Sequence, residues 1–237
     1  MSDLKEKREI AQSEARDKTT KIIAGMVPMG SAAYELLTTI VVPLHEKKRR
    51  EFIHDLASRL KKLEDQGQID FEELGRNEEF NTITTKAILL AQQNHQKEKL
   101  EALRNIVVNA SEKLTKEVIE FDEVDYFLSI LNRISPYHIL ILKKYQDPSM
   151  LSKGREAEYK KSKEDPLQAI GSTPKSILFV LNSDLVKKEN FVSLCWNDFM
   201  TFNLVKSVPF EELIEPGVKS LITDFGNKFL DMIEREE

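Results

Sequence analysis

Apolar residues recur at helical spacing along most of the chain, which predicts a mainly α-helical protein. Over 46–66, one apolar stripe separated by charged positions indicates an amphipathic helix of about five turns, with Gly67 well placed to end it. The patterns over 78–110 and 121–134 indicate further helices. The polar stretch 92–99 leaves open whether the first of these patterns is one helix or two. Short connections between such helices are typical of an antiparallel bundle.

A nearly uncharged stretch precedes the first amphipathic stripe, and Glu35 is its one charged residue over 24–44. Pro28 and Pro43 interrupt this stretch, so a helix is expected only over 31–42. Such a helix would be under about 20 Å long, too short to span about 30 Å of hydrocarbon. We predict that it packs as a core helix against the stripe that follows. The alternative is a segment released onto a membrane, aided by an adjacent basic run that could contact anionic lipid: Lys47, Lys48, Arg49 and Arg50.

The chain is predicted to have three parts: a charged N-terminal segment over 1–20, a helical bundle over 21–134 and a second domain over 135–237. Ser135 followed by proline is typical of a helix start, which marks the beginning of the second domain. Within this domain, 149–173 is rich in charge and lacks apolar periodicity. We expect these residues to form a charged surface loop.

Three stretches of the second domain resemble parts of a winged-helix domain. SPYHILILKKYQDP is similar to its first helix, ENFVSLCWNDFMTFNLV to its third helix, and LITDFGNKFLDMI to the strand and helix after the wing. The resemblance implies a degenerate winged helix with a short β-hairpin over 205–222. The charged insert over 149–173 departs from the compact form of that fold.

The N-terminal part also resembles known proteins. The region from GSAAYELLTTIVVPLHEKKRREFIHDLASRL to HQKEKLEALRNIVVNAS is similar to the opening domain of uncharacterised bacterial proteins of this layout. Its short apolar helix beside a long amphipathic one resembles helical bundles in membrane-attacking cell-death effectors, which is an analogy of fold alone. These resemblances imply a bacterial protein and lead us to expect a role in stress or phage defence.

The residues that correspond to a recognition helix, 189–203, favour contact with protein over contact with DNA. They include Glu189 and Asp198 and no Lys or Arg, whereas a DNA reader needs cationic or amide side chains facing phosphates and base edges. The proposed wing adds Glu211, Glu212 and Glu215, which would repel phosphate. The candidate interaction residues of this helix are three amides and the single tryptophan: Asn190, Trp196, Asn197 and Asn203.

Composition narrows the classes of function further. The chain has 237 residues, 32% of them charged, and a net charge of −5, which argues against a general nucleic-acid binder. One cysteine, Cys195, allows no internal disulfide and suits a reducing cytosol. The first twenty residues lack the apolar core of a secretory signal. We therefore expect a cytoplasmic protein.

Motifs that carry chemistry do not appear in the sequence. There is no glycine-rich phosphate loop, no CxxC pair and no HExxH, and the four histidines are scattered over separate predicted elements. The acidic residues at 120–125 precede an apolar helix, where they would favour the positive end of its dipole. We therefore predict no catalytic, cofactor-binding or metal-binding residue, and no cofactor.

The leading hypothesis is a non-enzymatic protein-interaction or regulatory module whose partner is another protein or a second copy of the chain. Two alternatives remain open. One is a membrane-perturbing helical effector that uses the apolar segment 24–44. The other is a DNA-binding transcriptional regulator that acts through the winged helix, although nucleic acid is the less expected partner.

Overall fold

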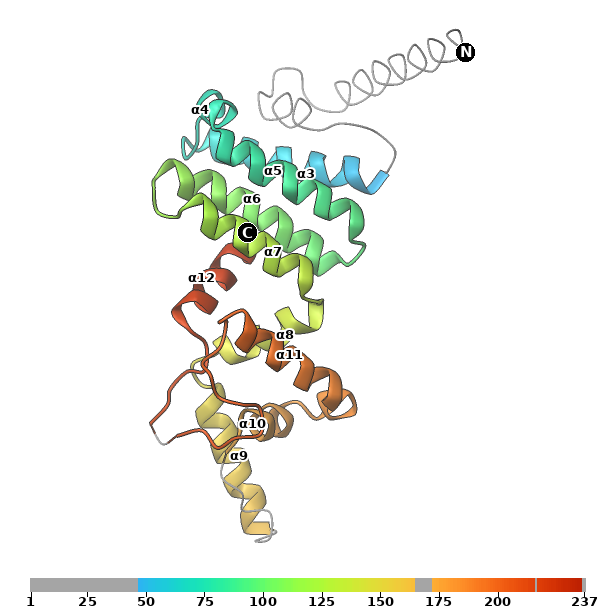
Figure 1. The fold of residues 1–237 in the computed structure, drawn as a ribbon, viewed down its shortest axis with the longest axis vertical. Helices are drawn as coiled ribbons and strands as arrows, with labels where there is room; N and C mark the ends of the chain where they lie inside the picture. The colour runs from blue at the N-terminus through green and yellow to red at the C-terminus, as the bar shows by residue number, and fades with distance from the viewer. Residues whose placement is uncertain (1–46, 165–171, 216, 236–237) are drawn as a thin grey trace. The chain divides into compact units, whose positions relative to one another are not determined.

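The computed structural model describes residues 47–164, 172–215 and 217–235, and it confirms a mainly helical protein. The predictions for 1–20 and for the apolar segment 24–44 lie outside these residues. The chain divides between Ser129 and Ile130 into two compact units, which Figure 1 shows as successive groups of helices. Each unit is described by itself below.

The described part of unit 1, from residue 47, contains four complete helices and the first part of a fifth. They are α3 (Lys47–Asp65), α4 (Phe71–Arg76), α5 (Glu78–Gln93), α6 (Lys97–Thr115) and α7 (Phe121–Arg133). The helix α3 packs against α5 and α6, and α5 packs against α6. The apolar stripe predicted for α3 is buried, with Phe52, Leu56, Leu60 and Leu63 at most 4% exposed. Periodic apolar residues therefore form the core here, as the pattern indicates.

The helix boundaries of unit 1 follow from local chemistry. Gly67 has a φ of 68°, the left-handed conformation that commonly follows a helix and that glycine adopts at little cost. The Asp70 carboxylate accepts hydrogen bonds from two backbone N–H groups at the start of α4. The pattern over 78–110 is two helices, because the backbone of Asn94 is extended and its side chain donates to the carbonyl of Leu90 at 2.8 Å.

The helix α6 is buried around most of its circumference, and its core positions include polar side chains. Asn105 and Asn109 are at most 7% exposed and Ser111 is fully buried. Arg59 of α3 donates to the Asn105 side-chain oxygen at 2.9 Å and pairs with Glu101 at 2.7 Å. Buried polar groups of this kind need specific partners, so these contacts fix α6 against α3.

Among its described residues, unit 2 contains five α-helices after the end of α7 and one 3₁₀ helix. They are α8 (Pro136–Gln146), α9 (Met150–Glu164), α10 (Pro174–Leu181), the 3₁₀ helix η2 (Ser183–Lys188), α11 (Glu189–Thr201) and α12 (Asp224–Ile233). The helix α8 packs against α9 and α11, and α9 packs against α10. Trp196 is fully buried, with ring centroids of Tyr145 at 5.0 Å, Phe210 at 5.4 Å and Phe199 at 6.2 Å. Aromatic packing thus forms the core of this unit.

The surface loop predicted over 149–173 is wrong for most of its length, because α9 occupies 150–164. A Cβ added at Gly154 would lie 2.5 Å from Ile177 Cγ2, so the bare glycine lets α9 approach α10 closely. At the helix start, the Asp147 carboxylate accepts a hydrogen bond from the Ser149 N–H at 2.8 Å. The contact is made by a small residue, which apolar periodicity does not reveal.

The predicted β-hairpin over 205–222 is also wrong, since the described residues contain no strand. One isolated antiparallel bridge joins Val205 and Ile222. Beside this bridge, the Lys206 N–H donates to the carbonyl of Leu221 at 2.8 Å. Farther along the intervening chain, called the 205–223 loop below, backbone groups bond to other elements. Trp196 Nε1–H donates to the carbonyl of Val208 at 2.8 Å, and the Lys175 N–H donates to the carbonyl of Phe210 at 2.9 Å. These bonds to α11 and to the start of α10 replace the ladder that a hairpin would form.

Candidate functional site

The helix α11 has one face in the core of unit 2 and one face in solvent. Val192, Cys195, Trp196 and Phe199 are fully buried. Asn190, Leu194, Asn197 and Thr201 are exposed and follow one another at intervals of three or four residues, so they share a single face. These four residues are called the α11 face below. Leu194 is 60% exposed, and the other three side chains are polar and uncharged.

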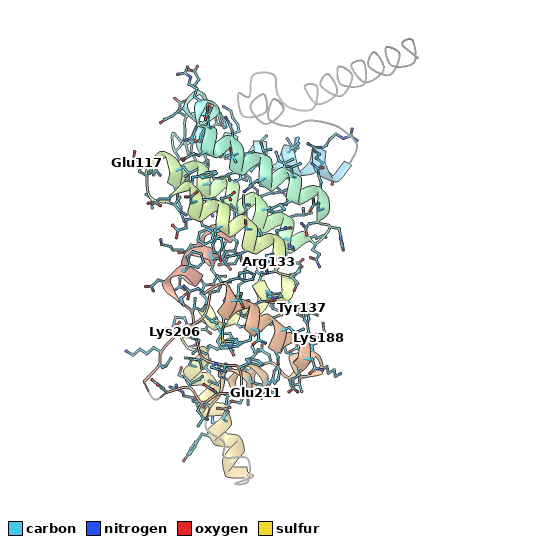
Figure 2. The ribbon with its side chains drawn as sticks, viewed as in Figure 1. Glu117, Arg133, Tyr137, Lys188, Lys206 and Glu211 are labelled. Carbon is cyan, nitrogen blue, oxygen red and sulfur yellow. The ribbon has the colours of Figure 1, made fainter. Side chains whose placement is uncertain are left out.

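A shallow depression adjoins the start of this face. Tyr137 of α8, Val186 and Lys187 of η2, Lys188 and Phe191 are among the residues that line it. Val186 is 46% and Phe191 39% exposed. Lys188 Nζ lies 3.9 Å from the centroid of the Tyr137 ring, a cation–π contact that can be followed in Figure 2, and Tyr137 packs edge to face on Phe191. The site thus combines exposed apolar surface with lysine side chains.

Each of the two acidic residues of α11 contacts a side chain of another helix. Glu189 pairs with Lys175 of α10, whose Nζ also lies 2.7 Å from Glu211 Oε1. Hydrogen bonds to Glu189 and then to Glu211 raise the pKa of Lys175. Asp198 Oδ2 lies 3.1 Å from His138 Nε2. Both carboxylates nevertheless stay about half exposed, at 44% for the Glu189 side chain and 51% for the Asp198 side chain, so α11 keeps the acidic character that its sequence indicates. Lys187 and Lys188 lie beside its start.

A buried hydrogen-bond cluster lies under this surface, and the sequence reading did not identify it. His138 Nδ1 lies 3.0 Å from Ser135 N, 2.8 Å from Ser135 Oγ and 3.5 Å from Cys195 Sγ. Its Nε2 contacts Asp198, which is 60 residues away in the chain. A serine or cysteine beside a histidine and a carboxylate resembles a nucleophile with its base. The signal in the sequence is the spacing of Ser135 and His138, which places them in the first turn of α8.

The chemistry of the cluster favours a role in joining helices. The backbone N–H of Ser135 donates to His138 Nδ1, which leaves the proton of a neutral ring on Nε2, from where it donates to Asp198. Burial, with a smaller effect of the Asp198 charge, raises the pKa of the Cys195 thiol to about 12, so the thiol stays protonated at neutral pH. Ser135 begins α8 in a capping box with His138. The cluster ties α8 to α11 and directs Asp198 toward the histidine.

The candidate interaction residues have different environments. Asn190 and Asn197 are exposed on the α11 face. Asn203 is exposed just beyond the helix end and has a φ of 56°. Trp196 is 0% exposed, so its assignment as an interaction residue is corrected: it is a core residue whose indole N–H holds the 205–223 loop.

The basic run proposed as a membrane contact is only partly described. The side chains of Lys47 and Lys48 lie outside the described part of the chain. Arg49 is buried, at 8% exposed, and Arg50 is exposed. Arg49 therefore does not present its charge at the surface. The two described side chains of this run do not form a continuous exposed cationic patch.

Two further findings concern the described residues alone. Within 47–164, 172–215 and 217–235, no group of three or more His, Cys, Asp or Glu side chains could hold a metal ion. In the same residues, no helix has the length and apolar character needed to cross a membrane. Among the acidic residues at 120–125, Asp125 pairs with Lys86.

Comparisons with protein-family models, curated proteins and solved structures found no match to this chain.

Proposed function

We propose that this protein is a non-enzymatic protein-interaction module, and that it binds its partner through the α11 face and the adjoining depression. The observation that carries the proposal is Leu194, which is 60% exposed among the polar side chains of the α11 face, with the exposed Phe191 and Val186 at the adjoining depression. Apolar side chains gathered on a surface and bordered by polar groups mark interaction sites. Phenylalanine and tyrosine are also enriched at such interfaces.

The charges around the depression define the chemistry of the partner. Lys187 and Lys188 are exposed, while Glu189 is paired with Lys175. A segment with an apolar side chain next to carboxylates would match this surface in both shape and charge. Double-stranded DNA matches it less well, because two lysines beside a helix that contains no Lys or Arg offer few contacts to phosphate.

The wider setting is proposed on the resemblances of sequence. Unit 1 would be a helical bundle that acts as a scaffold, and unit 2 a winged-helix-like domain without its hairpin, with α8, α10 and α11 in the places of the three helices. In support, these helices follow one another in that order along the chain. The protein would work in the bacterial cytoplasm as a regulator, in a stress or phage-defence response.

Site-specific photocrosslinking in cells tests the proposed surface. A photoreactive phenylalanine analogue is placed at Leu194 and, as the control, at Tyr159 of α9, which is 61% exposed. We expect a discrete protein adduct from position 194 and none from 159. Phe191→Ala should remove the adduct while leaving the thermal melt close to that of the parent.

The outcomes that would overturn the proposal are the absence of a protein adduct at position 194, or the same adducts from position 159. A gel-shift titration with random double-stranded DNA at moderate salt accompanies the experiment. A shift that Lys187→Glu abolishes, without any protein adduct, would replace the proposed module with a DNA-binding regulator.

A further inference from the structure

Two small patches of opposite charge lie near each other in unit 2. The basic patch is Lys187 and Lys188, and the acidic patch is Glu211 and Glu212 of the 205–223 loop. Lys175 connects them, because its ammonium group contacts both Glu189, the residue after the basic patch, and Glu211. The two patches are therefore neighbours, and Lys188 and Glu211 are labelled in Figure 2.

Each patch has a charge that no ion pair among the described residues neutralises. Lys187 and Glu212 are both exposed, and neither forms an ion pair within the part of the chain that the structure describes. Glu211 remains 73% exposed in its side chain although it contacts Lys175. Within the described residues, the Lys188 ammonium group contacts the face of the Tyr137 ring and forms no ion pair. The exposed Phe191 and Val186 lie with the basic patch.

Neighbouring patches of opposite sign are self-complementary under a two-fold rotation. In a two-fold contact the same surface of both copies takes part, so each contact between two different residues forms twice, once from each copy. The basic patch of one copy then faces the acidic patch of the other, and the reverse contact forms at the same time. A partner with a single charged patch would satisfy only half of this surface.

We propose that the occupant of this face is a second copy of the chain, which forms a two-fold dimer with Lys187 and Lys188 of each copy against Glu211 and Glu212 of the other. The contact would also cover Phe191 and Val186. This inference rests on the proposed function and names its partner. The net charge of −5 opposes approach of two copies at long range. At physiological ionic strength, screening over about 8 Å limits that repulsion, whereas the contacts at the interface remain.

Charge exchange between the two patches provides the test. Lys187→Glu and Glu212→Lys each change one exposed side chain without an ion pair in the described residues, so both variants should melt like the wild type. Lys62→Glu, at an exposed position of α3 in unit 1, is the control with the same change in charge as Lys187→Glu. Sedimentation velocity over a concentration series, up to about 100 μM, measures the dimerisation constant.

We expect the wild type and Lys62→Glu to dimerise reversibly and the two patch variants to dimerise at least about tenfold more weakly. An equimolar mixture of Lys187→Glu and Glu212→Lys should recover part of the lost association, because the acidic patches of one variant face the basic patches of the other. The chain with both changes should recover association as well.

A monomeric wild type over the whole concentration series would overturn the inference, as would a dimer that neither patch variant weakens. Failure of the mixture to associate more strongly than the separate variants would overturn it too. Photocrosslinking at Leu194 separates this result from the proposed function. An adduct with a different protein and a monomeric chain would leave the proposed function standing and remove the dimer, whereas no adduct and no dimer would remove both.

Discussion

Trp196→Phe is expected to destabilise unit 2 without altering the binding surface directly. The indole is 0% exposed, packs against Tyr145, Phe199 and Phe210, and donates to the carbonyl of Val208 at 2.8 Å. Phenylalanine retains an aromatic ring but cannot donate this bond. The substitution therefore tests whether the tryptophan holds the core and the 205–223 loop together.

The expected magnitude follows from the two interactions that are lost. A hydrogen bond contributes about 0.5–1.5 kcal/mol net. The indole also buries two more carbon atoms than the phenyl ring, and at about 0.8 kcal/mol per buried methylene these contribute about 1.6 kcal/mol. Together the loss in the free energy of unfolding should be about 2–3 kcal/mol.

Urea titration followed by far-ultraviolet circular dichroism measures this loss, because the substitution removes the only tryptophan that fluorescence could report. Asn197→Ala is the matched control: its side chain is the next in sequence but exposed, so stability should change by less than about 0.5 kcal/mol. A Trp196→Phe variant that unfolds at the wild-type urea concentration would refute the reasoning. So would a variant that keeps its stability and loses partner binding, since the indole would then act at the surface.

Three more predictions concern other features of unit 2. Gly226→Ala should lower the free energy of unfolding by about 1–3 kcal/mol, because the added Cβ would lie 2.1 Å from the carbonyl oxygen of Leu204. In a urea titration its midpoint should be well below that of Asn227→Ala, and equal midpoints would contradict the close contact. Thr223→Ala should lower the free energy of unfolding by about 1 kcal/mol, because Oγ1 accepts a hydrogen bond from the Gly226 N–H at 2.9 Å and so caps α12. In the same titration Thr223→Ser should keep most of this stability, and an unchanged midpoint for Thr223→Ala would argue against the cap. The Cys195 thiol of the folded protein should react with a disulfide reagent at pH 8 roughly a thousandfold more slowly than a free thiol, since burial raises its pKa to about 12. Urea at an unfolding concentration should remove this protection, and rapid labelling of the folded protein would contradict the burial of the thiol.

The helices with a broad apolar stripe could be predicted from the sequence. In α3 the spacing of Phe52, Leu56, Leu60 and Leu63 identifies the buried face, and Gly67 marks the end. The start of α8 is likewise readable, since Ser135 and the following proline have the chemistry of a helix N-terminus. Local preferences and burial agree in these segments, so short-range patterns are sufficient.

The helix α9 could not be predicted in this way. Its contact with α10 depends on Gly154 against Ile177, where the absence of a side chain permits close packing. A charged segment whose close approach to its neighbour is made at a glycine shows no apolar stripe, and its pattern is therefore that of a solvated loop. The stabilising information lies in α10, a different segment of the chain.

The 205–223 loop and the buried cluster show a second limit. The loop has the composition of a turn, but its path depends on Trp196 and on the backbone of Lys175. The pairing of His138 with Asp198 joins positions 60 residues apart. The pairing also orients the Asp198 carboxylate toward a histidine of another helix. The path of the loop and the orientation of Asp198 therefore depend on contacts between distant positions, which apolar periodicity does not predict.

The attachment of α12 has a consequence for the order in which the protein can fold during synthesis. The contacts of α3, α5 and α6 form among helices that leave the ribosome one after another. In unit 2, Lys143 of α8 pairs with Glu234 at 2.6 Å, and Gly226 of α12 packs against the backbone of Leu204. These contacts cannot form until α12 has emerged. Domains generally fold as units during translation, so α8 to α11 should wait in an incomplete state, exposed to chaperones, for about as long as the ribosome needs to add α12.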